Sequence, residues 1–171
     1  MAKNTKNNIR IPPQSLPSEQ AVLGSLMLRK EGMHEVEDVL MPESFYAEKH
    51  KIIFNAMLEL NRKNDPIDML SLSTKLSEQK NLERVGGNQY LAEIVNTVPS
   101  STNVRHYAEI VQKKYVLRSL IEAADYVSEL AFEEGDDHMD EILDMAEKKI
   151  FSVVSSPKNQ KFVNLRDSIP E

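Results

Sequence analysis

Apolar residues along most of this chain recur three and four positions apart, which is the spacing of one face of an α-helix. In the first part of the chain the apolar stripes are short, and a Gly or a Pro separates each stripe from the next. Ser15 and Asp68 stand where side-chain caps would begin helices. The pattern predicts five short helices between residues 15 and 98, enough for a compact helical head. The stripes occupy residues 21–27, 33–40, 47–63, 69–76 and 90–95.

The second half of the chain has a longer and less interrupted pattern. Between Thr102 and Glu134 there is no Gly and no Pro, so we predict one amphipathic helix of about nine turns at 3.6 residues per turn. Gly135 interrupts it, residues 138–155 predict a second helix, and Asp137 is the expected cap of that second helix. Two helices joined by a short turn form an antiparallel hairpin. The predicted fold class is therefore all-α, a compact multi-helix head followed by a long antiparallel helical hairpin.

The apolar stripe of the longer hairpin helix is wider than a single neighbouring helix would cover. Leaving apolar area in water costs about 25 cal/mol per Å², so the stripe is expected to pack on the head, on a second copy or on another protein. We favour a second copy, because isologous homodimers are the commonest soluble assemblies. We assign Phe45, Tyr46 and Ile53 to the head core. The residues that we assign to hairpin self-association are Tyr107, Val111, Leu117, Leu120, Ile121, Ile142 and Ile150.

The pattern divides the chain into four segments. Residues 1–14 are polar and basic and are predicted to be a flexible tail, residues 15–99 form the head, and residues 100–156 form the hairpin. Polar residues come after Pro157, and we expect residues 157–171 to be a linker and the start of a linker helix. Such a short helix is marginal in water, so we predict that it docks through its apolar positions, Phe162, Leu165 and Ile169.

Composition narrows the class of protein. With 171 residues, 40% of them hydrophobic, the chain has room for one domain, or one domain plus an extension, with a modest core. The absence of cysteine excludes disulfides and thiolate metal sites and suits a cytoplasmic protein. A net charge of -6 favours protein partners over nucleic acid, because nucleic-acid binding draws on Lys and Arg. No stretch approaches the ~18 apolar residues of a membrane span, and residues 1–10 lack the apolar core of a secretory signal.

The residue pattern contains no recognisable catalytic, cofactor or metal site. The five glycines cannot be assembled into a phosphate-binding G-x-x-x-x-G-K-[ST] loop or a G-x-G-x-x-G motif. The four histidines fall on four different predicted helices, without an H-E-x-x-H pattern. His34 and His138 lie near acidic residues, which we interpret as solvated polar faces. We therefore expect no enzyme activity and no cofactor in this chain.

Two charged clusters leave alternatives open. Acidic residues concentrate over residues 133–147, where they suit the N-terminus of the last predicted helix; contact with a basic partner is the alternative. A basic cluster on the long helix has a solvated face as its simpler interpretation and a contact with acid or phosphate as its functional one. Its members are Arg105, His106, Lys113, Lys114 and Arg118.

Several motifs, in a constant order across residues 12–108, resemble the N-terminal domain of bacterial replicative helicases of the DnaB type. The opening P-P-Q-S-L-P-S-E-Q-A-V-L-G is similar to a signature of that family, and so is F-Y-A-E-K-H-K-I-I-F. The segments D-P-I-D, V-G-G-N-Q-Y-L and V-P-S-S-T-N-V-R-H-Y-A match further family motifs. These motifs occupy residues 12–24, 45–54, 65–68, 85–91 and 98–108, and a looser resemblance continues to about residue 169.

The resemblance implies an architectural role in DNA replication, within the primosome. It implies that hairpins pair and that three such dimers make the collar of a hexameric ring, where primase docks and which helicase loaders engage. In the family an ATPase domain that uses ATP and Mg, and that contacts single-stranded DNA, comes after the linker helix. We expect that domain to be absent here, so the ATP-dependent 5'-3' helicase activity of the full-length family protein is not expected of this chain.

Two other functions remain open from the sequence. The chain would act as a stand-alone, helicase-like regulator if it joined rings made by a full-length partner. It would be a weak single-stranded DNA binder if the basic tail and the basic cluster on the long helix contacted phosphates, with an affinity that falls steeply with salt.

Overall fold

The computed structural model describes residues 10–133, 138–156 and 158, and every regular element within them is helical. The prediction of an all-α fold is thus confirmed. Three short 3-10 turns connect some of the helices: η1 (Lys30–Gly32), η2 (Pro42–Ser44) and η3 (Ser101–Asn103). The α-helices are α1 (Leu16–Leu28), α2 (Met33–Val36), α3 (Glu48–Arg62), α4 (Met69–Glu78), α5 (Gly87–Thr97), α6 (Val104–Phe132) and α7 (Met139–Val154).

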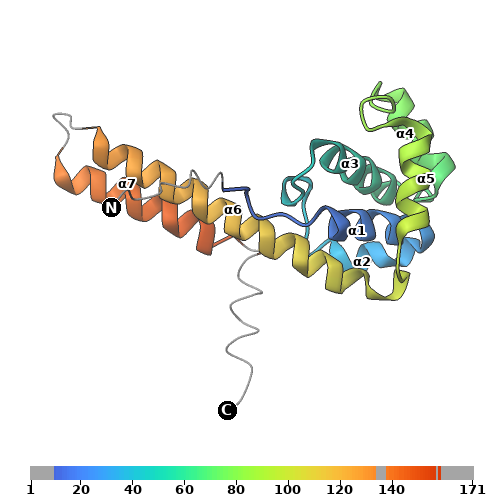
Figure 1. The fold of residues 1–171 in the computed structure, drawn as a ribbon, viewed down its shortest axis with the longest axis horizontal. Coiled ribbons are helices and arrows are strands. Elements are labelled where there is room, and N and C mark those ends of the chain that lie inside the picture. Colours follow the sequence, from blue (N-terminus) through green and yellow to red (C-terminus); the bar gives the residue numbers. More distant parts are fainter. Residues whose placement is uncertain (1–9, 134–137, 157, 159–171) are drawn as a thin grey trace, which may run out of the picture.

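The head is built around α1, in which every residue from Ala21 to Met27 is buried. Ser15 caps this helix, because its hydroxyl accepts a hydrogen bond from the Ser18 N–H, as predicted. Figure 1 shows α1 and α2 against the start of α6, with α3, α4 and α5 completing the head. The core includes Phe45 and Ile53, both 0% exposed, as expected, whereas Tyr46 is 39% exposed and its assignment to the core was wrong.

A single helix, α6, belongs to both parts of the molecule. Its first turns enter the head core through Val104, Ala108 and Val111, which are all buried. Its later turns leave the head and pack against α7. The apolar stripe seen in the sequence is therefore divided: the head covers its beginning and the hairpin carries the rest.

The hairpin is an antiparallel pair of helices with a narrow internal seam. Ala123 on α6 is fully buried, and Val153 is the only residue of α7 that is buried. After α7 the chain meets the head again, where the Lys158 ammonium donates hydrogen bonds to the carbonyl oxygens of Glu37 (3.0 Å) and Leu40 (2.6 Å).

Several predictions fall outside the described residues. These are most of the expected tail, the predicted break and cap at Gly135 and Asp137, and the docking residues Phe162, Leu165 and Ile169. Among the described helices, none combines the length and the apolar character that crossing a membrane requires.

Candidate protein-interaction surface

The head contains a buried polar network that holds three helices together. The Glu19 carboxylate on α1 accepts hydrogen bonds from the backbone N–H groups of Tyr46 (2.9 Å) and Ala47 (3.3 Å). It also lies 2.7 Å from Nδ1 of His50 on α3, and the other ring nitrogen of His50 lies 2.6 Å from the Tyr90 hydroxyl on α5. Glu19 and His50 are each 1% exposed, so this network braces the head and does not face a ligand.

Arg118 on α6 joins the base of the hairpin to the head. Its guanidinium donates to the carbonyl oxygens of Pro13 (2.8 Å) and Ser44 (3.0 Å) and lies over the rings of Tyr46 and Tyr115. Partial burial lowers the pKa of Arg118, although nearby carboxylates act in the opposite direction. A guanidinium this basic stays charged in proteins, so Arg118 binds the head as a cation.

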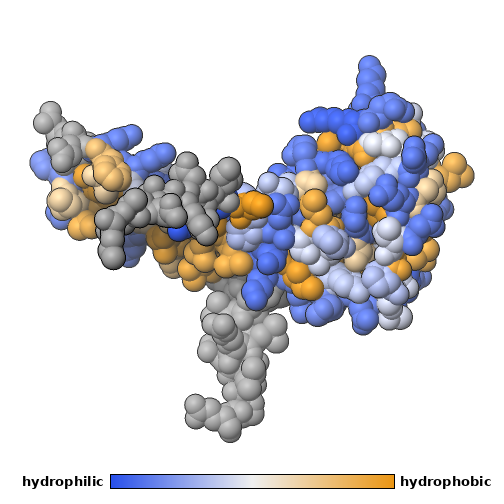
Figure 2. All heavy atoms as spheres, in the orientation of Figure 1, coloured by the Kyte–Doolittle hydropathy of each residue, from blue (hydrophilic) through white to orange (hydrophobic). Residues whose placement is uncertain are grey.

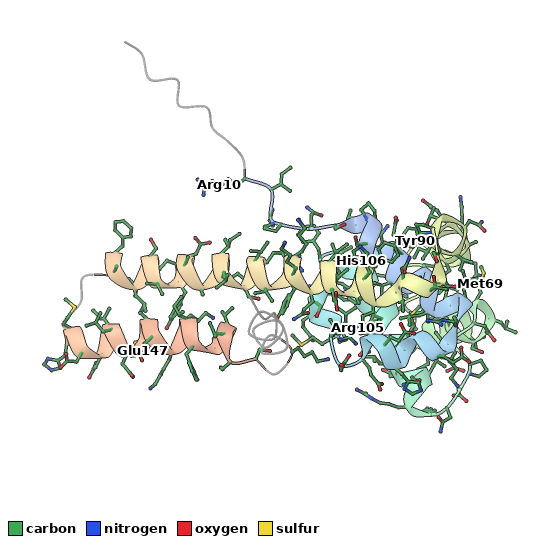
Figure 3. The ribbon with its side chains drawn as sticks, turned by 90° about the horizontal axis from the view of Figure 1, so that it is seen from below. Arg10, Met69, Tyr90, Arg105, His106 and Glu147 are labelled. Atoms are coloured by element: carbon green, nitrogen blue, oxygen red, sulfur yellow. The ribbon has the colours of Figure 1, made fainter. Side chains whose placement is uncertain are left out.

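The basic cluster on α6 is partly used within the chain. Arg105, labelled in Figure 3, ion-pairs with Asp38 (3.6 Å) and Glu109 (3.3 Å) and donates to the Glu35 carbonyl oxygen. Because Arg118 also binds carbonyl oxygens of the same chain, both arginines support the packing of the head. This argues against a continuous phosphate-binding track. Within the described residues no group of three or more His, Cys, Asp or Glu side chains is placed to hold a metal ion.

One face of the hairpin carries an apolar groove of about 780 Å³. Residues three and four apart on α6 form one wall, and residues four apart on α7 form the other. Phe151 is 66% exposed and Val154 52% exposed, so the protein itself leaves this apolar surface in water. Figure 2 shows hydrophobic residues gathered along the lower edge of the hairpin. The groove is lined by Ala124, Val127, Ser128, Ala146, Glu147, Ile150, Phe151 and Val154.

A second, smaller groove between the same helices is mostly polar. Its volume is about 260 Å³, and its lining includes Tyr115, Glu122, Lys149 and Ser152. Lys149 also lies over the Tyr126 ring, with its ammonium 5.3 Å from the ring centroid. The two grooves thus differ in character, the first apolar and the second mostly polar. Exposed apolar patches rimmed by polar residues mark protein interaction sites, so the apolar groove is the candidate surface.

The structure divides the residues that the sequence assigned to self-association. Leu120, Ile121 and Ile150 are 40–47% exposed, and Ile150 lines the apolar groove. Leu117 and Ile142 are half-buried.

Two of the assigned residues belong to the head instead. Val111 is 1% exposed, and Tyr107 packs partly buried against the same core. The head covers the first turns of α6, which the sequence stripe did not distinguish from the later ones. Val111 therefore cannot contact a second chain, and its assignment is corrected.

Sequence reasoning missed the residues that define the groove most strongly. Phe151 and Val154 are not among the residues predicted for self-association, although both are exposed, whereas their neighbour Val153 is buried in the seam with α6. A signal was present: Leu143, Glu147, Phe151 and Val154 succeed one another at intervals of four and three residues along α7. That spacing places them on one side of the helix.

The chain is similar to known proteins over most of its length. A family model, the DnaB-like helicase N terminal domain, matches residues 11–113. The replicative DNA helicase DnaC of Bacillus subtilis (strain 168) is 37% identical over 160 residues, which cover 94% of this chain and 35% of that protein. The replicative DNA helicase DnaB of Geobacillus stearothermophilus is 38% identical over 158 residues, which cover 92% of this chain and 35% of that protein. The chain therefore spans about a third of the length of these relatives.

Solved structures share the fold. A crystal structure of the N-terminal domain of DnaB helicase from Mycobacterium tuberculosis superposes with a TM-score of 0.77 at 34% identity, covering 83% of this chain and 99% of that one. The N-terminal domain of DnaB helicase from Helicobacter pylori was studied with its interactions with primase. It superposes with a TM-score of 0.60 at 26% identity, and the match covers 68% of this chain and 91% of that one. A DnaB-like replicative helicase, also studied with its interactions with primase, superposes with a TM-score of 0.68 at 25% sequence identity. The match covers 91% of this chain and 36% of that one.

Proposed function

The chain belongs to the family of DnaB-like helicase N-terminal domains, and from that premise we propose that it is a scaffold domain that self-associates through its hairpin and docks primase. Its relatives are named replicative DNA helicases. We propose that the contribution of this chain to replication is assembly and docking, and that strand separation is the work of other parts of such proteins.

The observation that carries the self-association is the apolar groove on the hairpin. Exposed Ile150, Phe151 and Val154 lie beside Ala124 and Ala146, so the same face bears protruding side chains and small ones. A two-fold pairing places the protrusions of one copy over the small residues of the other, as knobs fit into holes between helices. Such pairing would cover the apolar area that the monomer exposes and would provide the dimers from which a hexameric collar is built.

Primase docking is supported by the structures of related N-terminal domains that were determined in the context of their interactions with primase. Because primase would meet a collar built from paired hairpins, we propose that docking depends on self-association. A helicase loader is a further proposed partner of the same assembly.

The test is the mass of the chain in solution, measured by light scattering over a concentration series, then calorimetric titration with the cognate primase. We expect a mass of two or six protomers. Phe151→Asp should yield a monomer, because it places a charge in the apolar groove. Ser152→Asp, one residue later and lining the polar groove, is the matched control and should keep the wild-type mass. A wild-type chain that stays monomeric at the highest concentration would refute the proposal.

A further inference from the structure

Two polar residues interrupt the otherwise apolar lining of the hairpin groove. Ser128 comes from α6 and Glu147 from α7, and Figure 3 labels Glu147 on the α7 ribbon. Within the described part of the chain neither side chain forms a hydrogen bond or an ion pair. A carboxylate and a hydroxyl, one an acceptor and the other a donor, therefore share a groove without partners.

Three polar side chains elsewhere on the hairpin show the local partners that Ser128 and Glu147 lack. The hydroxyls of Ser119 and Ser152 donate to backbone carbonyl oxygens of their own helices, at 3.0 and 2.6 Å. Lys148 pairs with Asp144 at 2.8 Å, and the pairing raises the pKa of Lys148, first through the hydrogen bond. Glu147 has no such neighbour, because the residues four before and four after it are Leu143 and Phe151. The carboxylate thus stands in an apolar row.

The occupant that best suits this groove is a second copy of the hairpin, which is the proposed scaffold function and the premise of this inference. If an apolar surface covered the groove, the Glu147 carboxylate would lose water without gaining a donor, at a large free-energy cost. A second copy avoids that cost because it brings a Ser128 hydroxyl with it. In a two-fold pairing each copy offers one donor and one acceptor, so two equivalent contacts form together.

We propose that Glu147 of each hairpin accepts a hydrogen bond from Ser128 of the second copy, and that this pair of contacts sets the register of the dimer. Apolar helices that pack face to face can slide by a turn, about 5.4 Å, with little loss of buried area. A slide of that size would place each carboxylate against apolar side chains such as Ile150 and Phe151. One buried polar contact then selects a single register among several apolar alternatives.

The inference is tested by a double-mutant cycle on the dimer dissociation constant, measured by sedimentation equilibrium with Ser128→Ala, Glu147→Ala and the double variant. Helix content by circular dichroism checks that each chain folds. Hydrogen bonds to charged groups are worth ~1.5–3 kcal/mol, and each single variant removes both symmetric contacts, so it should weaken the dimer about a hundredfold or more. The double variant should be no weaker than the weaker single variant, since both changes remove the same contact.

Cross-linking tests the register directly. The chain has no cysteine, so a mixture of Ser128→Cys and Glu147→Cys chains can be treated with a short bismaleimide, and only a link between copies gives a product of twice the mass. We expect a high yield from this mixture. The control mixture of Ser152→Cys with Glu147→Cys should give little, because Ser152 lines the polar groove.

The outcomes separate this inference from the scaffold function. Suppose that Phe151→Asp abolishes the dimer, but that the double variant raises the dissociation constant by the product of the two single-variant factors. The groove is then the interface, and the Glu147–Ser128 contact is refuted. A Glu147→Ala variant that dimerises more tightly than the wild type refutes the contact in the same way. Equal cross-linking in both mixtures refutes it as well. A wild-type chain that never dimerises refutes both proposals, and primase binding to a monomer through the groove would assign the groove to primase.

Discussion

At the scale of single residues, the head depends on buried polar groups that satisfy one another. A carboxylate only accepts hydrogen bonds, so a neutral His50 beside Glu19 carries its proton on Nδ1, and its Nε2 accepts from the Tyr90 hydroxyl. The Tyr90 oxygen in turn accepts from the Gln20 side-chain amide at 3.2 Å. Each donor meets one acceptor, and the chain of bonds links α1, α3 and α5.

Removing the hydroxyl in the middle of this network should destabilise the head. Tyr90→Phe keeps the ring, over which the Lys49 ammonium lies 3.6 Å from the centroid, but it leaves Nε2 of His50 buried without a donor. We expect a loss of about 1–3 kcal/mol in the free energy of unfolding, measured by urea denaturation. The control is Tyr126→Phe on the hairpin, which should change stability little. Equal stability of both variants would contradict this account of the network.

At Gly24, α1 packs against the end of α5 with no room for a side chain. A Cβ atom there would lie 2.2 Å from Cγ2 of Val98 and 2.8 Å from the carbonyl oxygen of Ile94. Gly24→Ala should therefore force the two helices apart and cost about 1–3 kcal/mol, as overpacking does in cores. Gly32→Ala is the control, because its nearest neighbours would lie 3.4 Å away. Thermal melts of the two variants give the comparison, and a neutral Gly24→Ala would mean that the head absorbs the added methyl.

At this scale the helix N-caps could be predicted from the sequence, whereas the buried hydrogen-bond network could not. Ser15 and Asp68 cap α1 and α4 as predicted, because a cap depends on residues within one turn. The pairing of His50 with Glu19 joins residues 31 positions apart, and no local pattern encodes it. One clue was available: His50 lies three and four residues before Ile53 and Phe54, on the apolar face of its helix.

At the scale of elements, the strength of the apolar pattern decided which helices were predicted well. The helix expected between Thr102 and Glu134 is α6, Val104–Phe132, because 29 residues without Gly or Pro leave little choice. The helix expected over residues 33–40 was wrong in its second half. There the N–H groups of Val39 and Leu40 both donate to the Val36 carbonyl oxygen, and Pro42 begins a 3-10 segment.

Where α3 packs against α4, the Glu59 carboxylate contributes to stability in a pH-dependent way. The pKa of Glu59 is lowered, first by its hydrogen bond from Lys75 at 2.9 Å, and Gln79 donates to the same carboxylate. A group whose folded pKa is lowered stabilises the fold above its unfolded pKa and loses that contribution as pH falls through the folded value.

Glu59→Gln should therefore be slightly less stable than the wild type at neutral pH, because ion pairs that water still reaches contribute little. The difference should vanish in acid, below the range in which a free glutamate titrates. Urea unfolding of both chains across that range measures it. A difference that stays constant down to the lowest pH would show that the carboxylate charge contributes nothing.

At the scale of the whole molecule, stability is distributed unevenly between head and hairpin. The head shares one core that reaches from α1 to the beginning of α6, whereas Val153 is the only buried residue of α7, which packs mainly on α6. Elements with few buried contacts open most easily. The scaffold function implies that this weakness is present in the isolated chain and is relieved when two hairpins pair.

Hydrogen exchange should reveal that difference. In dilute solution the amides of α7 should exchange much faster than those of α1 and α3, and raising the protein concentration should slow α7 selectively. The Phe151→Asp variant should show fast exchange in α7 at every concentration. Protection of α7 equal to that of the head in a dilute monomer would contradict the assignment of the groove as a surface completed by a second copy.

The continuity of α6 has a mechanical consequence. At 1.5 Å per residue its 29 residues form a rod about 44 Å long, and the head holds its first half, from Val104 and Ala108 to Arg118. The free half is about 21 Å long, so a tilt of about 10° at the head moves its tip by about 4 Å. Two rods joined through the grooves on their free halves would therefore act as coupled levers, and a small rotation of one head would be transmitted to the other as a displacement of a few ångströms.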